Sequence, residues 1–301
     1  MTTHATESPS HAFTNVEQQL SGELSVAPEF AKAFGAPGQF FTENTANGRF
    51  YSKYGSMSAW MYVVPFGLQK MLTGKSPVEG ERTTLLALNL FNWALSIVVA
   101  WLLFDLTLFF FPGRATLAAG LVLAEFYATF LWNYLRVQNS EIFQILFFLL
   151  LMRFALPILR GEFSRRTFVG VWLSLLALVL TKISFIPLVL IFLGAWILFE
   201  REQNETTLAE AALKIAKLNA LPLAALIAFV ATLNTVKFGS PLLTGYHQWR
   251  PEIHALNGDI TESIWALFFS PQWSLWVHFP VAVFAFFAWP AFFKRARLFF
   301  Q

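Results

Sequence analysis

Cysteine is absent from the 301 residues, and charged residues are scarce. Without cysteine the chain has neither a disulfide framework nor a thiolate metal site. Only 13% of the residues are charged, whereas a typical soluble domain carries about 25%. The net charge is +3, and the basic residues stand in short groups rather than in one stripe, so nucleic acid is not an expected partner.

The motifs of soluble enzymes are also missing. The sequence has no Gly-rich phosphate loop, no His-Glu-x-x-His and no nucleophile elbow. His247 and His254 lack a third ligand at a suitable spacing, so they are interpreted as surface histidines rather than a metal site. No cofactor is expected; a divalent cation is compatible with the sequence but is not indicated by it.

Apolar residues dominate what is present. Hydrophobic residues make up 56% of the chain, Phe alone occupies 35 positions, and the mean hydropathy is +0.54. About twenty apolar residues suffice to cross a membrane as a helix. The sequence therefore predicts an all-α, polytopic integral membrane protein with about seven transmembrane helices. The apolar runs cover residues 83–111, 115–135, 140–160, 167–199, 215–236 and 273–293.

The polar and mixed residues 1–82 are predicted to be an N-terminal extracytoplasmic loop region with interfacial segments, and residues 83–301 a transmembrane helical domain with an outer loop at 237–263. The run 167–199 would form roughly 50 Å of helix, too long for a hydrocarbon core of about 30 Å. A break near Thr181 and Lys182 turns it into two crossings. The basic groups around Arg114, 160–166, 201–217 and 294–297 then share the cytoplasmic side.

Four ionisable residues lie within or at the ends of the apolar runs, namely Asp105, Glu125, Arg153 and Lys182. A charge in this environment needs a partner or a water-filled cavity. Each is either a paired or snorkelling structural charge or a functional group. Asp105, Glu125 and Arg153 could line a path, as in a transporter or lipid flippase, although no matching interrupted spans indicate inverted repeats.

Two stretches on the predicted outer side carry a family resemblance. The first is NGRFYSKYG at 47–55, and the second is KFGSPLLTGY at 237–246, followed by FSP at 269–271 and FP at 279–280. They resemble segments of bacterial GT-C membrane glycosyltransferases, the superfamily of protein mannosyltransferases and aminoarabinose transferases. The resemblance runs from about Leu20 to Arg297. Both stretches are expected to pack together on the outer side.

This resemblance implies a sugar transfer from a polyprenyl-phosphate donor at the outer face of the membrane, with inversion at the anomeric carbon. A carboxylate would deprotonate the acceptor hydroxyl, and cations would hold the donor phosphate through charge-assisted hydrogen bonds. The tyrosines would stack on sugar, or else belong to the interfacial aromatic belt. The expected substrate-binding residues are Arg49, Tyr51, Lys53, Tyr54, Lys182, Tyr246 and Arg250.

The expected catalytic carboxylates are Glu141, Glu7 and Glu17. Glu141 follows Asn139-Ser140 at an outer helix start, where relatives often carry an acidic residue; its alternative role is to interact with the helix macrodipole. Glu7 has the family spacing from Gly22, but the family's acidic pair with Asp is missing, because the first Asp is Asp105. The family also has a span before this region and further spans after Arg297, so the chain is expected to be truncated at both ends.

The resulting hypothesis is a multi-pass protein of the inner (plasma) membrane. Its expected partners are a polyprenyl-phosphate sugar and membrane lipid. A transporter or flippase is one alternative, and a non-catalytic membrane scaffold is another.

Overall fold

The computed structural model describes residues 25, 41–52, 55–75, 81–129, 131–136, 140–245 and 260–269. Their regular secondary structure is helical except for one antiparallel hairpin of β1 (Phe41–Asn44) and β2 (Arg49–Ser52), in which Phe41 pairs with Ser52. The chain divides into two compact units. The first comprises Met1–Leu103 and Tyr134–Pro251, and the second Phe104–Asn133 and Glu252–Gln301.

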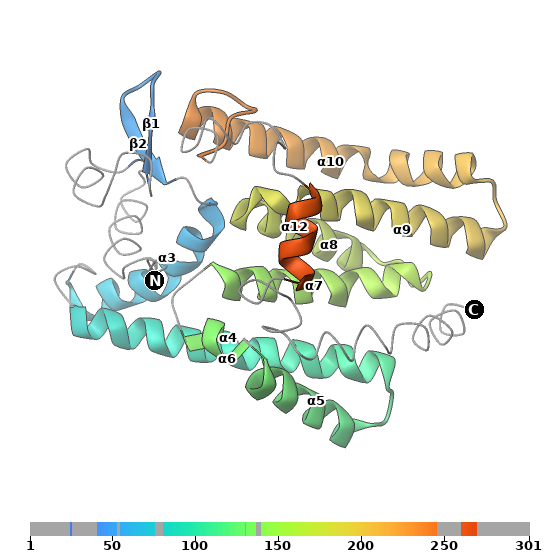
Figure 1. The fold of residues 1–301 in the computed structure, drawn as a ribbon, viewed down its shortest axis with the longest axis horizontal. Coiled ribbons are helices and arrows are strands. Elements are labelled where there is room, and N and C mark those ends of the chain that lie inside the picture. Colours follow the sequence, from blue (N-terminus) through green and yellow to red (C-terminus); the bar gives the residue numbers. More distant parts are fainter. Residues whose placement is uncertain are drawn as a thin grey trace. The chain divides into compact units, whose positions relative to one another are not determined.

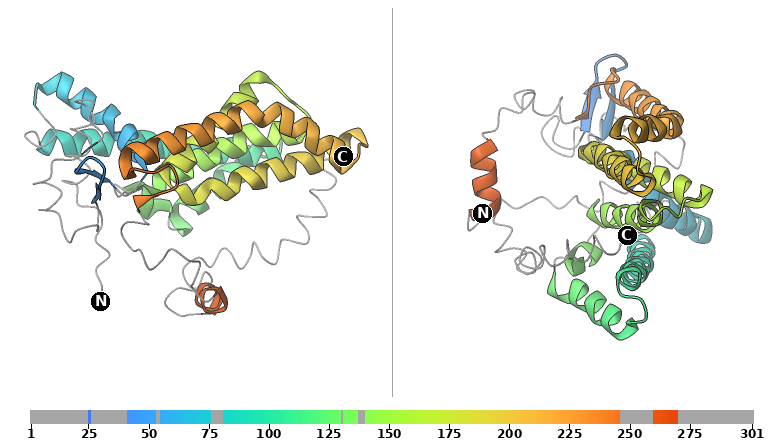
Figure 2. Two further views of the ribbon diagram at one scale, coloured as in Figure 1. Left: turned by 90° about the horizontal axis from the view of Figure 1, so that it is seen from above. Right: turned by 90° about the vertical axis from the view of Figure 1, so that its right-hand side faces the viewer.

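Four helices running up and down form the body of the first unit (Figure 1). They are α7 (Glu141–Leu159), α8 (Arg165–Thr181), α9 (Ile186–Asn204) and α10 (Leu208–Phe238). Their packing is seen end-on in the right-hand view of Figure 2. α7 approaches α8 closely because Gly170 has no side chain; a Cβ there would lie 2.5 Å from Cγ of Phe154. Inside the bundle, Trp172 Nε1 donates to Asn219 Oδ1 at 3.0 Å, which joins α8 to α10.

The predicted break in the run 167–199 is confirmed. α8 ends at Thr181, Lys182 is extended (φ −155°, ψ 122°), and a 3-10 turn, η1 (Ile183–Phe185), leads into α9. Pro187 is in the first turn of α9, where a missing N–H costs no helix hydrogen bond. Because of this break, the α7–α8 turn and the α9–α10 turn lie together, and Gln203 Nε2 donates to Leu159 O at 3.4 Å.

We call this end of the bundle the basic end. It carries the exposed side chains of Arg165, Arg166, Arg201 and Lys214. Lys214 forms an ion pair with Glu200 across the α9–α10 turn. Capping boxes at Ser164 and Thr207 begin α8 and α10 here, so both helix starts are specified by their local sequence.

The opposite end, which we call the hairpin end, gathers the hairpin, α3 (Ser56–Thr73) and the first part of α4 (Glu81–Phe110). The Tyr62 ring of α3 lies 6.1 Å from that of Phe91 in α4 and 5.1 Å from that of Phe143 in α7. Residues 41–75, assigned to a loop region by the sequence analysis, thus contain a hairpin and a helix. Gly74 ends the helix in the left-handed conformation (φ 67°), which glycine adopts without strain.

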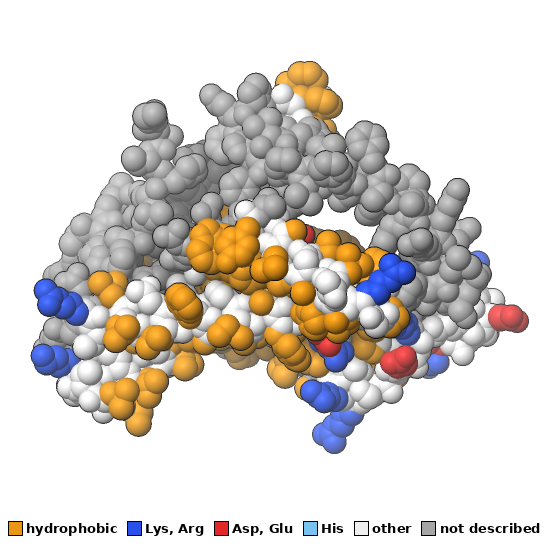
Figure 3. Space-filling view, turned by 90° about the horizontal axis from the view of Figure 1, so that it is seen from below, with side chains coloured by type: hydrophobic (Ala, Val, Ile, Leu, Met, Phe, Trp, Pro, Cys, Tyr) orange, Lys and Arg blue, Asp and Glu red, His pale blue; other side chains and the backbone are white. Residues whose placement is uncertain are grey.

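Four helices in the described part of the chain are long and apolar enough to cross a membrane: Arg82–Phe110, Glu141–Leu159, Ile183–Asn204 and Leu208–Phe238. Large apolar side chains such as Trp93, Leu190 and Leu198 are exposed along them. Figure 3 shows apolar side chains spread over one face of the described residues. The protein therefore has the helices of a multi-pass membrane protein.

Two of the expected spans are not observed as single helices in the described residues. The run 115–135 is not one helix but divides into α5 (Ala115–Ala128) and α6 (Leu131–Arg136). The Thr129 hydroxyl donates to Glu125 O and accepts from Leu131 N at 3.1 Å, so its side chain competes with the backbone ladder at this point. The run 273–293 lies outside the described residues. The described part of the second unit also contains α12 (Ile260–Phe269).

The helix break predicts the membrane sidedness of two turns. Reporter fusions after Arg166 and after Glu205 should both read cytoplasmic, because the basic end carries the Lys and Arg residues. A fusion after Gly74 should read external. Paired alkaline phosphatase and green fluorescent protein reporters provide the measurement. An external reading at Glu205 combined with a cytoplasmic reading at Arg166 would contradict the arrangement.

Candidate functional site

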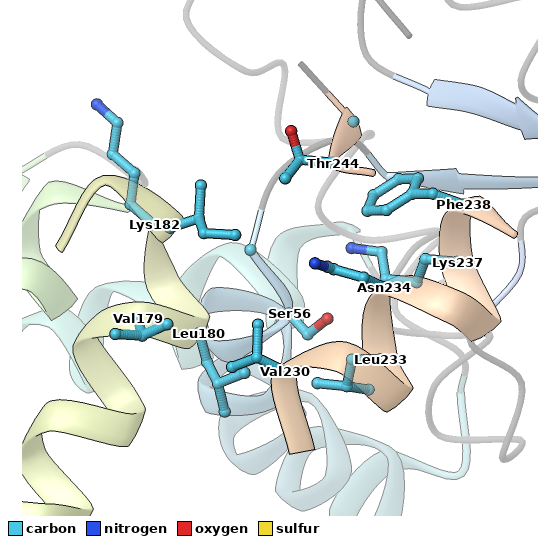
Figure 4. Close-up of a pocket in the computed structure, with 13 residues that line it drawn as sticks. Ser56, Val179, Leu180, Lys182, Val230, Leu233, Asn234, Lys237, Phe238 and Thr244 are labelled. Atoms are coloured by element: carbon cyan, nitrogen blue, oxygen red, sulfur yellow. The ribbon is translucent and has the colours of Figure 1, made fainter. Parts of the chain in front are cut away.

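A small cavity lies at the hairpin end of the bundle (Figure 4). Its walls come from the start of α3, the α8–η1 junction, the last turns of α10 and the turn that follows α10. The cavity measures about 50 Å³, and one water molecule needs roughly 10–15 Å³ on this measure. It therefore has room for a compact group of a few atoms. The polar residues that line it are Ser56, Lys182, Asn234, Lys237 and Thr244.

Gly55 allows α3 to begin directly against the end of α8. A Cβ at Gly55 would overlap the carbonyl oxygens of Leu180 and Thr181. Gly55 is also the N-cap residue of α3, and no side chain caps this helix start. The positive end of the α3 dipole is thus placed beside terminal carbonyls of α8, and the two partial charges attract each other.

Asn44 attaches the hairpin to the end of α10. Its Nδ2 donates to Val236 O at 3.0 Å, and its Oδ1 accepts from Ala46 N at 2.9 Å. Gly239 ends α10 with φ 81°, and a Cβ there would lie 3.2 Å from Asn44 Oδ1. Asn234 Nδ2 donates to Pro241 O at 3.1 Å. These contacts fold the stretch that begins at Lys237 back over the cavity.

The electrostatic character of the cavity is positive. Lys237 is buried, with only 7% of its surface exposed, and its Nζ lies 5.1 Å from the centroid of the Phe238 ring. In Figure 4 the side-chain nitrogens of Lys237 and Asn234 point toward the middle of the cavity, whereas the exposed Lys182 extends away from it. No Asp or Glu is among the described residues that line the cavity. An anion is the complementary ligand.

The structure brings together the two stretches that carry the family resemblance. Gly55, the last residue of the first stretch, lines the same cavity as Lys237, Thr244 and Gly245 of the second. Lys182, from the predicted outer turn between two spans, lines it as well. The expected packing of the two stretches is therefore observed in the described residues.

Other expected site residues lie elsewhere. Arg49 is an exposed residue of β2. Tyr51 is 3% exposed, and its hydroxyl accepts from Asn47 Nδ2 at 3.2 Å, which is a structural contact within the hairpin. Neither lines the cavity, and their binding roles stay predictions. Glu7, Glu17, Lys53, Tyr54, Tyr246, His247, Arg250 and His254 lie outside the described residues.

Glu141 begins α7 and is half-buried. Ser140 Oγ donates to its Oε2 at 3.3 Å. Phe143, two residues later, contacts Tyr62 of α3, so Glu141 belongs to the hairpin end although it does not line the cavity. A carboxylate in the first turn of a helix is also favoured by the macrodipole.

Four polar lining residues were not among the expected binding residues: Ser56, Asn234, Lys237 and Thr244. Lys237 and Thr244 belong to the stretch at 237–246 that carries the resemblance, whereas Ser56 and Asn234 are common polar residues with no signal of their own. The carboxylates Asp105 and Glu125 are in the second unit, whereas Arg153 is in the first. Among the described residues, no group of three His, Cys, Asp or Glu side chains could hold a metal ion.

Comparison of the chain with protein-family models, with curated proteins and with solved structures finds no match.

The close approach at Gly55 predicts a stability effect. Gly55→Ala should force α3 away from the end of α8, and such overpacking costs about 1–3 kcal/mol. We expect a lower midpoint of thermal unfolding in detergent. Gly194→Ala in α9 is the matched control, because no atom lies within 4 Å of the added methyl group. Equal midpoints for Gly55→Ala and the wild type would mean that the contact with Leu180 and Thr181 is not formed.

Proposed function

We propose that the protein is a GT-C-like glycosyltransferase, or a fragment of one, that transfers a sugar from a polyprenyl-phosphate donor to an acceptor at the outer face of the membrane. The observation that carries the proposal is the cavity in which the two family-like stretches meet. It is lined by the buried Lys237 of the second stretch and by the start of α3. In this proposal the protein is a multi-pass protein of the inner (plasma) membrane with about seven spans, and the hairpin end is the outer end.

The donor phosphate is the group that suits the cavity. Lys237 offers a buried ammonium group. Asn234 Nδ2 points toward the cavity beside it and has one amide hydrogen besides the one donated to Pro241 O. The start of α3, where no side chain caps the helix, adds partial positive charge. A phosphate oxygen accepts charge-assisted hydrogen bonds from such donors. The cavity of about 50 Å³ suits a phosphate and is too small for the sugar as well.

In this proposal Lys182 attracts the donor phosphate from a distance and does not hold it. Lys182 is one of the lining residues, but its side chain is exposed and extends away from the cavity. A long lysine side chain can swing toward an arriving anion, and an exposed ammonium contributes mainly to attraction at longer range. Lys182 therefore guides the donor phosphate, whereas Lys237 holds it.

The transfer step needs a general base near the acceptor hydroxyl. In the proposed mechanism a carboxylate removes the hydroxyl proton, the acceptor oxygen attacks the anomeric carbon, and the bond to the donor phosphate breaks with inversion. The phosphate leaves as an anion, which the positive cavity stabilises. Of the three expected catalytic carboxylates, Glu141 is the one within the described residues, and it begins α7 at the hairpin end.

No observation in the described residues favours a transporter, a flippase or a scaffold over this proposal.

The test is transfer of labelled sugar from polyprenyl-phosphate donors by membranes that contain the protein. Lys237→Met should lower the transfer rate about ten- to hundredfold, because loss of a charge-assisted contact costs about 1.5–3 kcal/mol. Lys237→Arg keeps the charge and should retain more activity than Lys237→Met. Lys217→Met removes an exposed lysine from the same helix and is the matched control.

The amount of each variant in the membrane is measured in parallel by quantitative blotting. Undiminished transfer by Lys237→Met would refute the phosphate role of Lys237. An equal loss in Lys217→Met would show that the effect is one of general charge. Absence of transfer by the wild type from every polyprenyl-phosphate sugar would refute the glycosyltransferase proposal itself.

Glu141→Gln provides a second test of the same reaction. The amide keeps the shape of the side chain and loses the charge, so transfer should fall about ten- to hundredfold without a change in membrane abundance. Gln144→Leu alters a polar residue one turn further along α7, where Gln144 Nε2 donates to Ser140 Oγ at 3.2 Å, and should have a smaller effect. Full activity of Glu141→Gln would exclude Glu141 as the base. Equal losses of activity and abundance would mean that its role is structural.

A further inference from the structure

The hairpin and the last turn of α10 meet at Asn44, which precedes Val236 by 192 residues in the sequence. Asn44 is the last residue of β1, and only 2% of its surface is exposed. Its Nδ2 donates to Val236 O at 3.0 Å. Val236 lies in the last turn of α10, where the carbonyl groups have no partner further along the helix. Asn44 thus caps the end of α10 from a distant part of the chain.

The hairpin turn itself orients the Asn44 amide. Asn44 Oδ1 accepts from Ala46 N at 2.9 Å, and the oxygen is the atom of the amide that can accept from an N–H group. The amide nitrogen therefore faces Val236 O. The backbone carbonyl of Asn44 accepts from Gly48 N at 2.8 Å and from Asn47 N at 3.2 Å. All three of these bonds are local to the hairpin, so the amide is oriented by residues outside α10.

The residue after Val236 is Lys237, the buried cation of the positive cavity. Its Nζ lies 5.1 Å from the centroid of the Phe238 ring, and both residues belong to the last turn of α10. The direction of the lysine side chain therefore depends on that turn. Asn44 does not line the cavity, so its effect on an anion there is indirect.

We propose that Asn44 is a positioning residue, which caps the last turn of α10 and thereby keeps the ammonium group of Lys237 in the cavity, where it binds the phosphate of the donor. This role rests on the phosphate site proposed above. Helix ends fray where their carbonyl groups lose their partners. In a frayed turn the ammonium group would turn toward water, which solvates it better, and the phosphate would lose its charge-assisted contact.

The experiment measures the binding of two probes to the purified full chain in detergent. Farnesyl phosphate carries a short polyprenyl chain with one phosphate, and farnesol carries the same chain without it. Asn44→Ser keeps an oxygen that can accept from Ala46 N in the turn but is too short to reach Val236 O. It should bind farnesyl phosphate about three- to tenfold more weakly than the wild type, as loss of one hydrogen bond gives, and farnesol equally well. Native mass spectrometry over a concentration series measures the affinities.

Asn47→Ser is the matched control for the loss of an amide from the turn. Asn47 Oδ1 accepts from Arg49 N at 2.9 Å, and its Nδ2 donates to the Tyr51 hydroxyl at 3.2 Å, so these bonds stay within the hairpin. This variant should bind both probes as the wild type does.

A double variant separates positioning from a general effect on the fold. Lys237→Met alone should weaken the binding of farnesyl phosphate, and adding Asn44→Ser should weaken it no further. The two effects are not additive if Asn44 acts through Lys237. A residue that only stabilises the fold would weaken binding in the presence of either side chain at position 237.

Lysine labelling follows the Lys237 side chain directly and does not depend on the glycosyltransferase proposal. Reductive methylation of the purified chain is followed by mass spectrometry of its peptides. In the wild type the buried Lys237 should react more slowly than Lys217, an exposed lysine of the same helix. Asn44→Ser should speed the reaction at Lys237 and leave the rate at Lys217 unchanged.

Unchanged binding of farnesyl phosphate by Asn44→Ser, beside weaker binding by Lys237→Met, would overturn the role of Asn44 and leave the phosphate site intact. Equal affinity of the wild type for both probes would refute the phosphate site, and the role of Asn44 with it. Additive losses in the double variant, or equal acceleration of labelling at both lysines, would also overturn that role. If Asn44→Ser does not fold, as thermal unfolding reports, Asn44→Thr replaces it, because threonine suits a strand. Loss of the fold in both variants would assign Asn44 to folding instead.

Discussion

The break between α8 and α9 is the constraint on which the arrangement of the first unit depends. An unbroken helix over the run 167–199 would place the α7–α8 and α9–α10 turns at opposite ends of the bundle. The extended Lys182 and the 3-10 turn after it reverse the chain instead, and Gln203 contacts Leu159 across the two turns. The same reversal leaves carbonyl groups of Leu180 and Thr181 at the hairpin end, where α3 begins against them.

The charged side chains at the two ends of the bundle differ in their exposure to solvent. At the basic end the charged residues are exposed, and Lys214 is paired with Glu200, so water and counter-ions screen them. At the hairpin end Lys237 is buried beside a helix start. Burial of a cation is unfavourable unless an anion or polar groups replace its hydration, so the surroundings of Lys237 favour an anion more than those of an exposed lysine would.

Residues of α3 line two cavities of different polarity. Ser56, in the first turn of α3, lines the positive cavity, whereas Gln69, near its last turn, lines a groove between α3 and α4 whose described lining residues carry no charge. The uncapped start of the helix supplies partial positive charge, and this effect fades within the first turn. At the other end Gln69 donates both of its amide hydrogens to threonine hydroxyls, and its Oε1 is buried.

The sequence by itself determined the membrane class, the positions of the long apolar helices and the break at Lys182, because these follow from apolar run length and from the distribution of Lys and Arg, which are local properties of the chain. It also placed the two family-like stretches on one side. Only the tertiary structure decided that Gly55, Lys182, Lys237 and Thr244 line one cavity, that Tyr51 is buried in the hairpin and that Asn44 caps the last turn of α10. These features arise from contacts between segments that are far apart in the sequence. The residue pattern of one segment does not indicate which other segment it contacts.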